Sequence, residues 1–199
     1  MIICKDRDVA DRWPVYHSAL GNAKNLRLDN TTGEESDSTI WNSTSPASTV
    51  FSVGANVRSN RLNSNYIAYC FTEVENYSKF GVYTGNGSSD GPFVYCGFKP
   101  AWLLMKNTGT ANWLLLDVAR GQYYNPIGYK NSTKESLYAN SNVAESGTGT
   151  GFEVDFLPNG FKCRASVPGE LNESGSTYIF AAFAENPFGG DGVPPATAR

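Results

Sequence analysis

The sequence contains one histidine, His17, and only 18% charged residues, and both scarcities narrow the chemistry open to the chain. A Ser-His-Asp or Cys-His catalytic group would have to use this histidine. It directly follows the apolar pair Val15 and Tyr16, so the polar end of a strand explains it better. No pair of carboxylates stands out as the acid and base of a glycosidase. We therefore expect no enzymatic activity.

Basic charge and long apolar runs are also lacking. The net charge is -3, and the basic residues form only small groups, such as Lys24 with Arg27. A nucleic-acid partner would require a basic surface that displaces counterions. No apolar run approaches the roughly 20 residues of a membrane span, and the apolar stretch at the N-terminus is too short for a signal peptide. We expect no nucleic-acid partner, no membrane insertion, and assembly in a reducing cytoplasm.

Metal-binding patterns are missing as well. The four cysteines form no CxxC motif and have apolar or strand-forming neighbours, which predicts buried free thiols without a disulfide or a metal–thiolate site. They are Cys4, Cys70, Cys96 and Cys163. The acidic group at 29–37 supplies oxygen ligands of the kind Ca²⁺ prefers but lacks EF-hand spacing, so solvated loop charge is favoured. Its members are Asp29, Glu34, Glu35 and Asp37. We expect no metal and no cofactor.

Aromatic residues are abundant, at 13%, and are interspersed with Asn, Ser, Thr and Gly. Aromatic and β-branched residues favour strands, and small polar residues favour the turns between them. Residues 152–156 alternate apolar and charged positions, and Pro158, Asn159 and Gly160 then predict a tight turn into the next strand. The fold class predicted from these patterns is all-β and antiparallel.

An internal repeat organises the chain, since five blocks occur twice in the same order. The pairs are 2–6 with 103–107, 13–16 with 113–116, 28–32 with 138–142, 50–53 with 160–163, and 66–73 with 178–185. In the first two pairs, an apolar segment ends in Lys and Trp opens the next apolar segment, as in a β-hairpin. The repeat predicts that Trp13 corresponds to Trp113 and Tyr66 to Tyr178.

The repeat predicts two tandem β-sandwich, jelly-roll-like units that arose by internal duplication. The first covers residues 1–77, the second covers 78–188, and a Gly/Pro-rich tail follows at 189–199. The second unit opens with apolar segments at 80–83 and 93–98 that have no counterpart before residue 2. We therefore expect the first unit to be completed from outside its own segment, along an open edge beside residues 2–5. The completing strand would come from upstream residues, a neighbouring subunit, or the weaker candidate, the C-terminal tail.

The segments at 79–87, 99–106 and 178–187 together resemble a repeat found in structural proteins of bacteriophages, including tail-fibre-like proteins of marine phages. The resemblance covers nearly the whole chain and concerns a domain of unassigned function. It implies a virion protein, with other virion proteins and further copies of the chain as partners. It supplies no catalytic residues.

Three aromatic residues are candidates for glycan or subunit contacts: Trp41, Tyr123 and Tyr124 lie in Asn/Ser/Gly-rich segments and have no repeat partner. Exposed aromatic rings stack on sugars, and aromatic residues are also enriched in subunit contacts. The leading hypothesis is thus a structural component of a tail fibre or tail appendage, with a possible role in attachment to host glycans. A carbohydrate-binding module of a larger protein and a capsid decoration protein are the alternatives.

Overall fold

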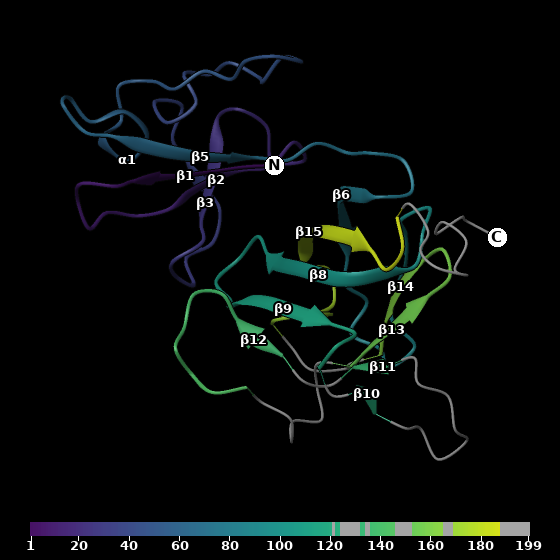
Figure 1. The fold of residues 1–199 in the computed structure, drawn as a ribbon. Coiled ribbons are helices and arrows are strands. Elements are labelled where there is room, and N and C mark those ends of the chain that lie inside the picture. Colours follow the sequence, from purple (N-terminus) through teal and green to yellow (C-terminus); the bar gives the residue numbers. More distant parts are fainter. Residues whose placement is uncertain (121, 124–131, 134–135, 146–152, 165–168, 188–199) are drawn as a thin grey trace. The chain divides into compact units, whose positions relative to one another are not determined.

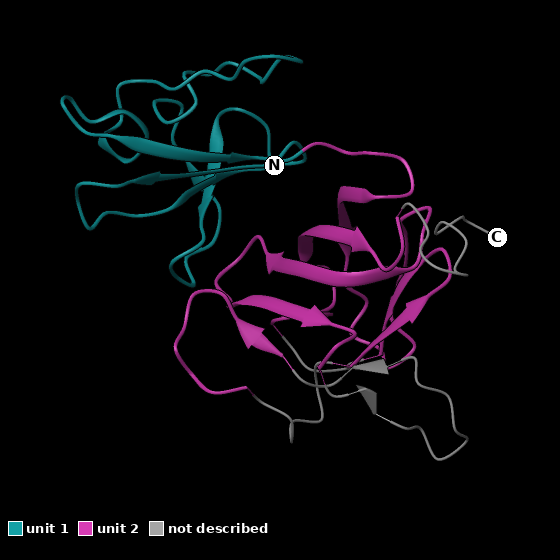
Figure 2. Cartoon of the chain, in the orientation of Figure 1, with its two compact units in different colours: residues 1–71 teal, residues 72–199 magenta. Residues whose placement is uncertain are grey.

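The computed structural model describes residues 1–120, 122–123, 132–133, 136–145, 153–164 and 169–187. As the sequence predicted, the protein is all-β, with three five-stranded antiparallel sheets (Figure 1). The chain divides into two compact units, residues 1–71 and 72–199 (Figure 2). The boundary therefore falls between Phe71 and Thr72, ahead of the expected position near residue 78. No helix in the described part of the chain is both long and apolar enough to cross a membrane.

Unit 1 contains one sheet, with strand order β4-β3-β2-β1-β5. Its strands are β1 (Ile2–Asp6), β2 (Pro14–Tyr16), β3 (Lys24–Arg27), β4 (Glu35–Ser36) and β5 (Tyr66–Cys70). Strand β1 is an interior strand, which pairs with β2 on one side and with β5 on the other. Ile2, Ile3 and Cys4 are all buried, so both faces of β1 are covered, which explains its nearly continuous apolar character.

Loop residues cover one face of the unit 1 sheet. Ile40, Trp41 and Phe51 pack against the core of that sheet, and the rings of Tyr16 and Trp41 meet edge to face at 5.8 Å. The short helix α1 (Val57–Asn60) follows, and its first turn is capped by the side chain of Asn56.

The sandwich expected for unit 1 is therefore not seen in residues 1–71, all of which the structure describes. The segment 50–53, which the repeat paired with a strand of unit 2, is irregular backbone here. The large rings of Trp41 and Phe51 fill the space over the sheet, so a second sheet is not needed to bury that face.

Unit 2 has two five-stranded sheets. One has the order β12-β9-β8-β15-β6 and the other β10-β11-β13-β14-β7. The strands of the first are β6 (Ser78–Thr84), β8 (Pro100–Asn107), β9 (Trp113–Asp117), β12 (Leu137–Tyr138) and β15 (Thr177–Ala184). Those of the second are β7 (Phe93–Tyr95), β10 (Gln122–Tyr123), β11 (Ser132–Thr133), β13 (Val154–Leu157) and β14 (Gly160–Cys163).

A single core joins the two sheets of unit 2. Met105, Tyr178 and Phe180 from the first sheet share it with Phe156 and Phe161 from the second. The rings of Tyr83 and Tyr178 are stacked with their centroids 4.9 Å apart, a favourable separation for an aromatic pair. The predicted turn after β13 is confirmed, since β13 and β14 form an antiparallel hairpin in which Leu157 pairs with Gly160.

The two units share one pairing scheme around β1 and β8, each of which lies between two antiparallel strands. In unit 1, Ile2 pairs with Tyr16 on one side and Cys70 on the other. In unit 2, Leu103 pairs with Leu116 and Ala182. Under the repeat predicted from the sequence, these are the same positions, and the agreement continues along β1 and β8 to the pairs Asp6 with Tyr66 and Asn107 with Tyr178.

Matching polar contacts hold the turns in both units. The backbone N–H of Trp13 donates to the carboxylate of Asp29 at 2.8 Å, and that of Trp113 donates to the side-chain oxygen of Asn140 at 2.7 Å. The sequence alignment paired Asn30 with Asn140 and was wrong by one residue. Asp29 and Asn140 lie in the turns that follow β3 and β12, and their contacts with the tryptophan backbone show that they occupy equivalent positions.

A second matching contact involves Tyr66, the first residue of β5, and Tyr178, the second residue of β15. Each phenol donates to one backbone carbonyl and accepts from one backbone N–H in the segment that precedes its strand. Tyr66 bonds to Val57 O at 2.5 Å and Arg61 N at 3.0 Å, and Tyr178 bonds to Gly169 O at 3.1 Å and Glu173 N at 2.9 Å. The loop is thereby fixed to the strand that it precedes.

The four cysteines are free, and three of them are buried. Burial raises the pKa of the thiols of Cys4, Cys96 and Cys163 to about 12, and the neighbouring Cys70 adds to the effect at Cys4. The prediction that all four are buried was wrong for Cys70, which is exposed on β5.

Thiol reactivity tests this arrangement, because a thiolate attacks the reagent and burial suppresses its formation. With 5,5′-dithiobis(2-nitrobenzoic acid) at pH 8, we expect Cys70 to react rapidly and the other three thiols only after denaturation. The variant Cys70→Ser should lose the rapid phase completely. Rapid reaction of a second thiol in the folded protein would contradict the burial of Cys4, Cys96 and Cys163.

Candidate interaction edge

Strand β5 exposes apolar side chains that the corresponding strand of unit 2 buries. Ile67 and Tyr69 are 38% and 44% exposed, whereas their counterparts Ile179 and Ala181 are each 1% exposed. The two strands also differ in sheet position: β15 lies between β8 and β6, whereas β5 is the last strand of its sheet. An exposed apolar edge strand marks a site for interaction with another strand.

The backbone of β5 presents free hydrogen-bonding groups along this edge. Phe71 and Met1 exchange hydrogen bonds at 2.9 and 3.0 Å, which assigns the inward-facing positions of the antiparallel ladder to alternate residues. The N–H and C=O groups of Tyr66, Ala68 and Cys70 therefore point away from β1. Within the described residues, no hydrogen bond satisfies these outward groups of Ala68 and Cys70.

Natural edge strands commonly carry a charge or a proline that prevents further pairing. Strand β5 has the sequence YIAYC and contains neither. It also pairs without interruption with β1 over all five of its residues. The edge of β5 is thus competent in both backbone and side chains to accept another strand.

An ion pair between Asp6, at the end of β1, and Arg61, in the segment before β5, helps to hold β5 against β1. The buried Asp6 carboxylate accepts hydrogen bonds from the N–H groups of Asp8 and Val9 and from Arg61 Nε at 3.1 Å. Arg61 in turn precedes β5 and also contacts Asp11 at 2.5 Å. Burial alone would raise the pKa of Asp6, but the N–H of Asp8 and the Arg61 guanidinium outweigh burial, so that the pKa lies below its ordinary value.

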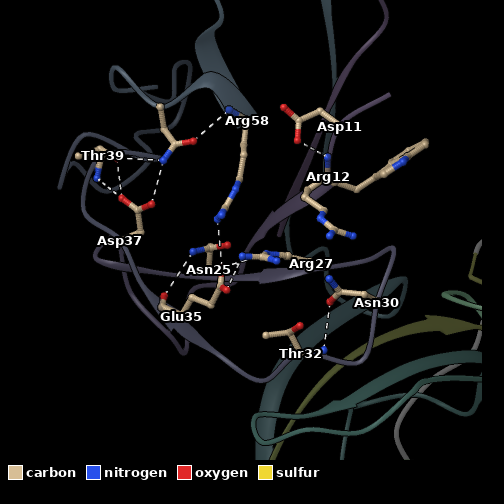
Figure 3. A network of polar contacts seen from close by, with 12 residues as sticks. Asp11, Arg12, Asn25, Arg27, Asn30, Thr32, Glu35, Asp37, Thr39 and Arg58 are labelled. Atoms are coloured by element: carbon tan, nitrogen blue, oxygen red, sulfur yellow. Dashed lines mark hydrogen bonds and ion pairs between the residues drawn. The ribbon is translucent and has the colours of Figure 1, made fainter. Parts of the chain in front are cut away.

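The acidic residues considered as Ca²⁺ ligands are distributed among separate partners, which Figure 3 shows for Glu35 and Asp37. Glu35 is held between Arg27 and Arg58, and Asp37 accepts hydrogen bonds from Asn56 and Thr39. Asp29 pairs with Arg12 at 3.1 Å, and Glu34 pairs with Lys24 at 2.5 Å. The described residues contain no group of three or more His, Cys, Asp or Glu side chains that could hold a metal ion. These carboxylates fasten the loops of unit 1 to its sheet.

Of the three aromatic candidates for glycan or subunit contact, Trp41 is excluded. It is 1% exposed and lies in the core of unit 1, because the loop that carries it folds over the sheet. Tyr123 lies in β10, which pairs with β11, and Tyr124 lies outside the described residues. The polar residues around Trp41 in the sequence therefore wrongly predicted that its side chain is exposed.

His17 lies at the turn that follows β2, in agreement with the strand-end interpretation. Its side chain is buried, and Nδ1 accepts a hydrogen bond from the backbone N–H of Ala19 at 3.2 Å. Its backbone carbonyl accepts from the N–H of Leu20 at 3.0 Å. These contacts stabilise a turn.

The open edge expected beside residues 2–5 was misplaced. Strand β1 has both neighbours within unit 1, and Ile2, Ile3 and Val15 are buried. The open edge is that of β5 instead, because β5 returns to pair with β1 and takes the outer position. In unit 2 the strand β15 has β6 as its outer neighbour, and only the sheet order of the structure reveals this.

Comparison with known proteins places the chain in one family. It belongs to the family described as Domain of unknown function (DUF7483), whose model matches residues 1–187 and so extends over both units. No curated protein and no solved structure matches the chain.

The Asp6 contact predicts a pH effect on unit 1. A carboxylate whose folded pKa is lowered stabilises the fold above its unfolded value of about 3.9, and the stabilisation is lost as the pH falls through the folded pKa. Asp6→Asn keeps the turn, as Asn107 does in unit 2, but loses the ion pair. We expect this variant to melt at a lower temperature than the parent at pH 7 and the difference to shrink below about pH 4.

Thermal melting followed by circular dichroism between pH 3 and pH 7 measures this difference. Glu75→Gln serves as the control, because it removes an exposed carboxylate from unit 2. A melting difference between Asp6→Asn and the parent that stays constant down to pH 3 would show that the ion pair does not stabilise unit 1.

Proposed function

We propose that this protein is a non-enzymatic structural component of a bacteriophage virion, part of a tail fibre or similar appendage, and that its two units arose by duplication. The observation that carries the proposal is the shared pairing register of the two units together with their matching turn contacts. The resemblance of segments 79–87, 99–106 and 178–187 to repeats of phage structural proteins supports the virion location.

The features shared by the units are architectural. The matched contacts run from side chains to the backbone and fix turns, as Lys5 and Lys106 also do by donating to the carbonyls of Asp6 and Asn107, both at 2.6 Å. A duplicated enzyme would be expected to repeat a constellation of reactive side chains. Repetition of turn contacts instead fits a protein selected for stable, tandem β-units.

In this proposal the partners are other virion proteins and further copies of the chain, with host-surface glycans as a possible target of attachment. Nucleic acid and membrane insertion form no part of it, in keeping with the net charge of -3. A glycan array probes the attachment role, and capsid decoration and a carbohydrate-binding module of a larger protein are the competing assignments.

The duplication predicts that equivalent contacts stabilise each unit equivalently. Asp29→Ala and Asn140→Ala each remove the side-chain acceptor of a tryptophan backbone N–H, and each should lower the free energy of unfolding of its own unit by about 1 kcal/mol. Asp29→Asn keeps this acceptor, as Asn140 provides it in unit 2, and loses only the exposed ion pair with Arg12, so it should cost less than Asp29→Ala. Hydrogen exchange at Trp13 and Trp113 measures the effect in each unit. Asp29→Asn as damaging as Asp29→Ala would contradict equivalence.

The virion location has a direct test. Antibodies raised against the purified chain should label the tails of phage particles from lysates of cells that carry the coding sequence, as seen by immunogold electron microscopy. Label on the capsid would favour a decoration protein. Absence of the chain from purified particles by mass spectrometry would refute the proposal.

A further inference from the structure

We propose that the open edge of β5 is a strand-accepting site, which binds an extended, mainly apolar peptide segment of the β6 type. The segment would pair antiparallel with β5 and complete the sheet of unit 1. This inference rests on the proposed equivalence of the two units. It assigns to unit 1 a binding site and to the ligand a direction, a register and a side-chain pattern.

Unit 2 provides the template for this pairing. Its strand β15 pairs with β8 on one side and accepts β6 on the other, antiparallel over all seven residues of β6. The pairing between β5 and β1 has the same register as that between β15 and β8. The outward groups of β5 therefore occur at the positions from which Tyr178, Phe180 and Ala182 face β6.

The exposed side chains of β5 specify the chemistry of one face of the ligand. In unit 2, Phe80 and Val82 lie opposite Ala181 and Ile179, and those positions correspond to Tyr69 and Ile67. Residues directly opposite in an antiparallel pair lie on the same face of the sheet. Apolar residues at the two positions of Phe80 and Val82 in an incoming strand would thus cover the rings and methyl groups that β5 exposes.

The other face of β5 differs from the template at one position, and this difference makes the proposal specific. In unit 2, Gly81 lies opposite Phe180, and a Cβ on Gly81 would come within 2.7 Å of the phenylalanine ring. In unit 1 the position of Phe180 is taken by Ala68, which is exposed. The space filled by the ring in unit 2 is open in unit 1, so a ligand strand can carry a large apolar residue where β6 carries glycine.

Two fluorescein-labelled peptides probe the edge. The first has the sequence of β6, SKFGVYT, and the second has leucine in place of glycine, SKFLVYT. Fluorescence anisotropy with the full chain should show binding of both peptides. The leucine peptide should bind about tenfold more tightly, because its side chain is buried over Ala68.

Variants of Ala68 separate edge pairing from other binding. Ala68→Pro removes an outward N–H that β1 does not use, so it should abolish binding of both peptides while the sheet stays folded. Ala68→Phe recreates the pairing of unit 2 and should reverse the preference, so that the glycine peptide binds more tightly than the leucine peptide. Leu62→Lys is the control, because Leu62 is 87% exposed but lies outside β5.

Each outcome decides the proposal. Binding that survives Ala68→Pro, or a peptide preference that Ala68→Phe leaves unchanged, would overturn it. A chain that binds neither peptide would also overturn it, as would a dimer in sedimentation velocity that Ala68→Pro dissociates, since a second β5 would then occupy the edge. The peptide assay does not depend on where the protein resides, so its failure leaves the immunogold test of the virion location intact.

Discussion

The antiparallel pairing of β1 with β5, and of β8 with β15, is the constraint on which both units depend. Each pairing joins two strands that are far apart in the sequence and therefore closes a long loop, which costs chain entropy. The intervening segments offset this cost through local contacts, above all the side-chain bonds to the tryptophan N–H groups and the tyrosine phenols. These contacts set the register from which the rest of each unit follows.

The sheet that contains β1 and β5 and the sheet that contains β8 and β15 are covered in different ways. Unit 2 packs a second sheet against it and places β6 at the edge of β15, so that β15 is buried over most of its length. Unit 1 uses loop residues, including Trp41, and among the strands that the structure describes none pairs with the outer edge of β5. Burying a face requires only apolar volume, which a loop can supply, whereas completing an edge requires backbone hydrogen bonds, which only another strand supplies in series.

The charged residues of unit 1 serve this architecture. Glu35 bridges two arginines from different segments, and Asp6 joins the end of β1 to the loop before β5. Partly buried pairs of this kind specify which segments meet, because an unpaired charge in the same place would be costly. The side chains that resembled a ligand set in the sequence are thereby committed to holding loops.

The sequence by itself determined the all-β class and the hairpins, because strand periodicity and turn residues are local signals. Only the tertiary structure decided which strand lies at the edge and which side chains are buried. Trp41 is in the core and Cys70 is exposed, the reverse of what their neighbours in sequence predicted. Burial depends on segments distant in the chain, and no local pattern records whether such a segment covers a given strand.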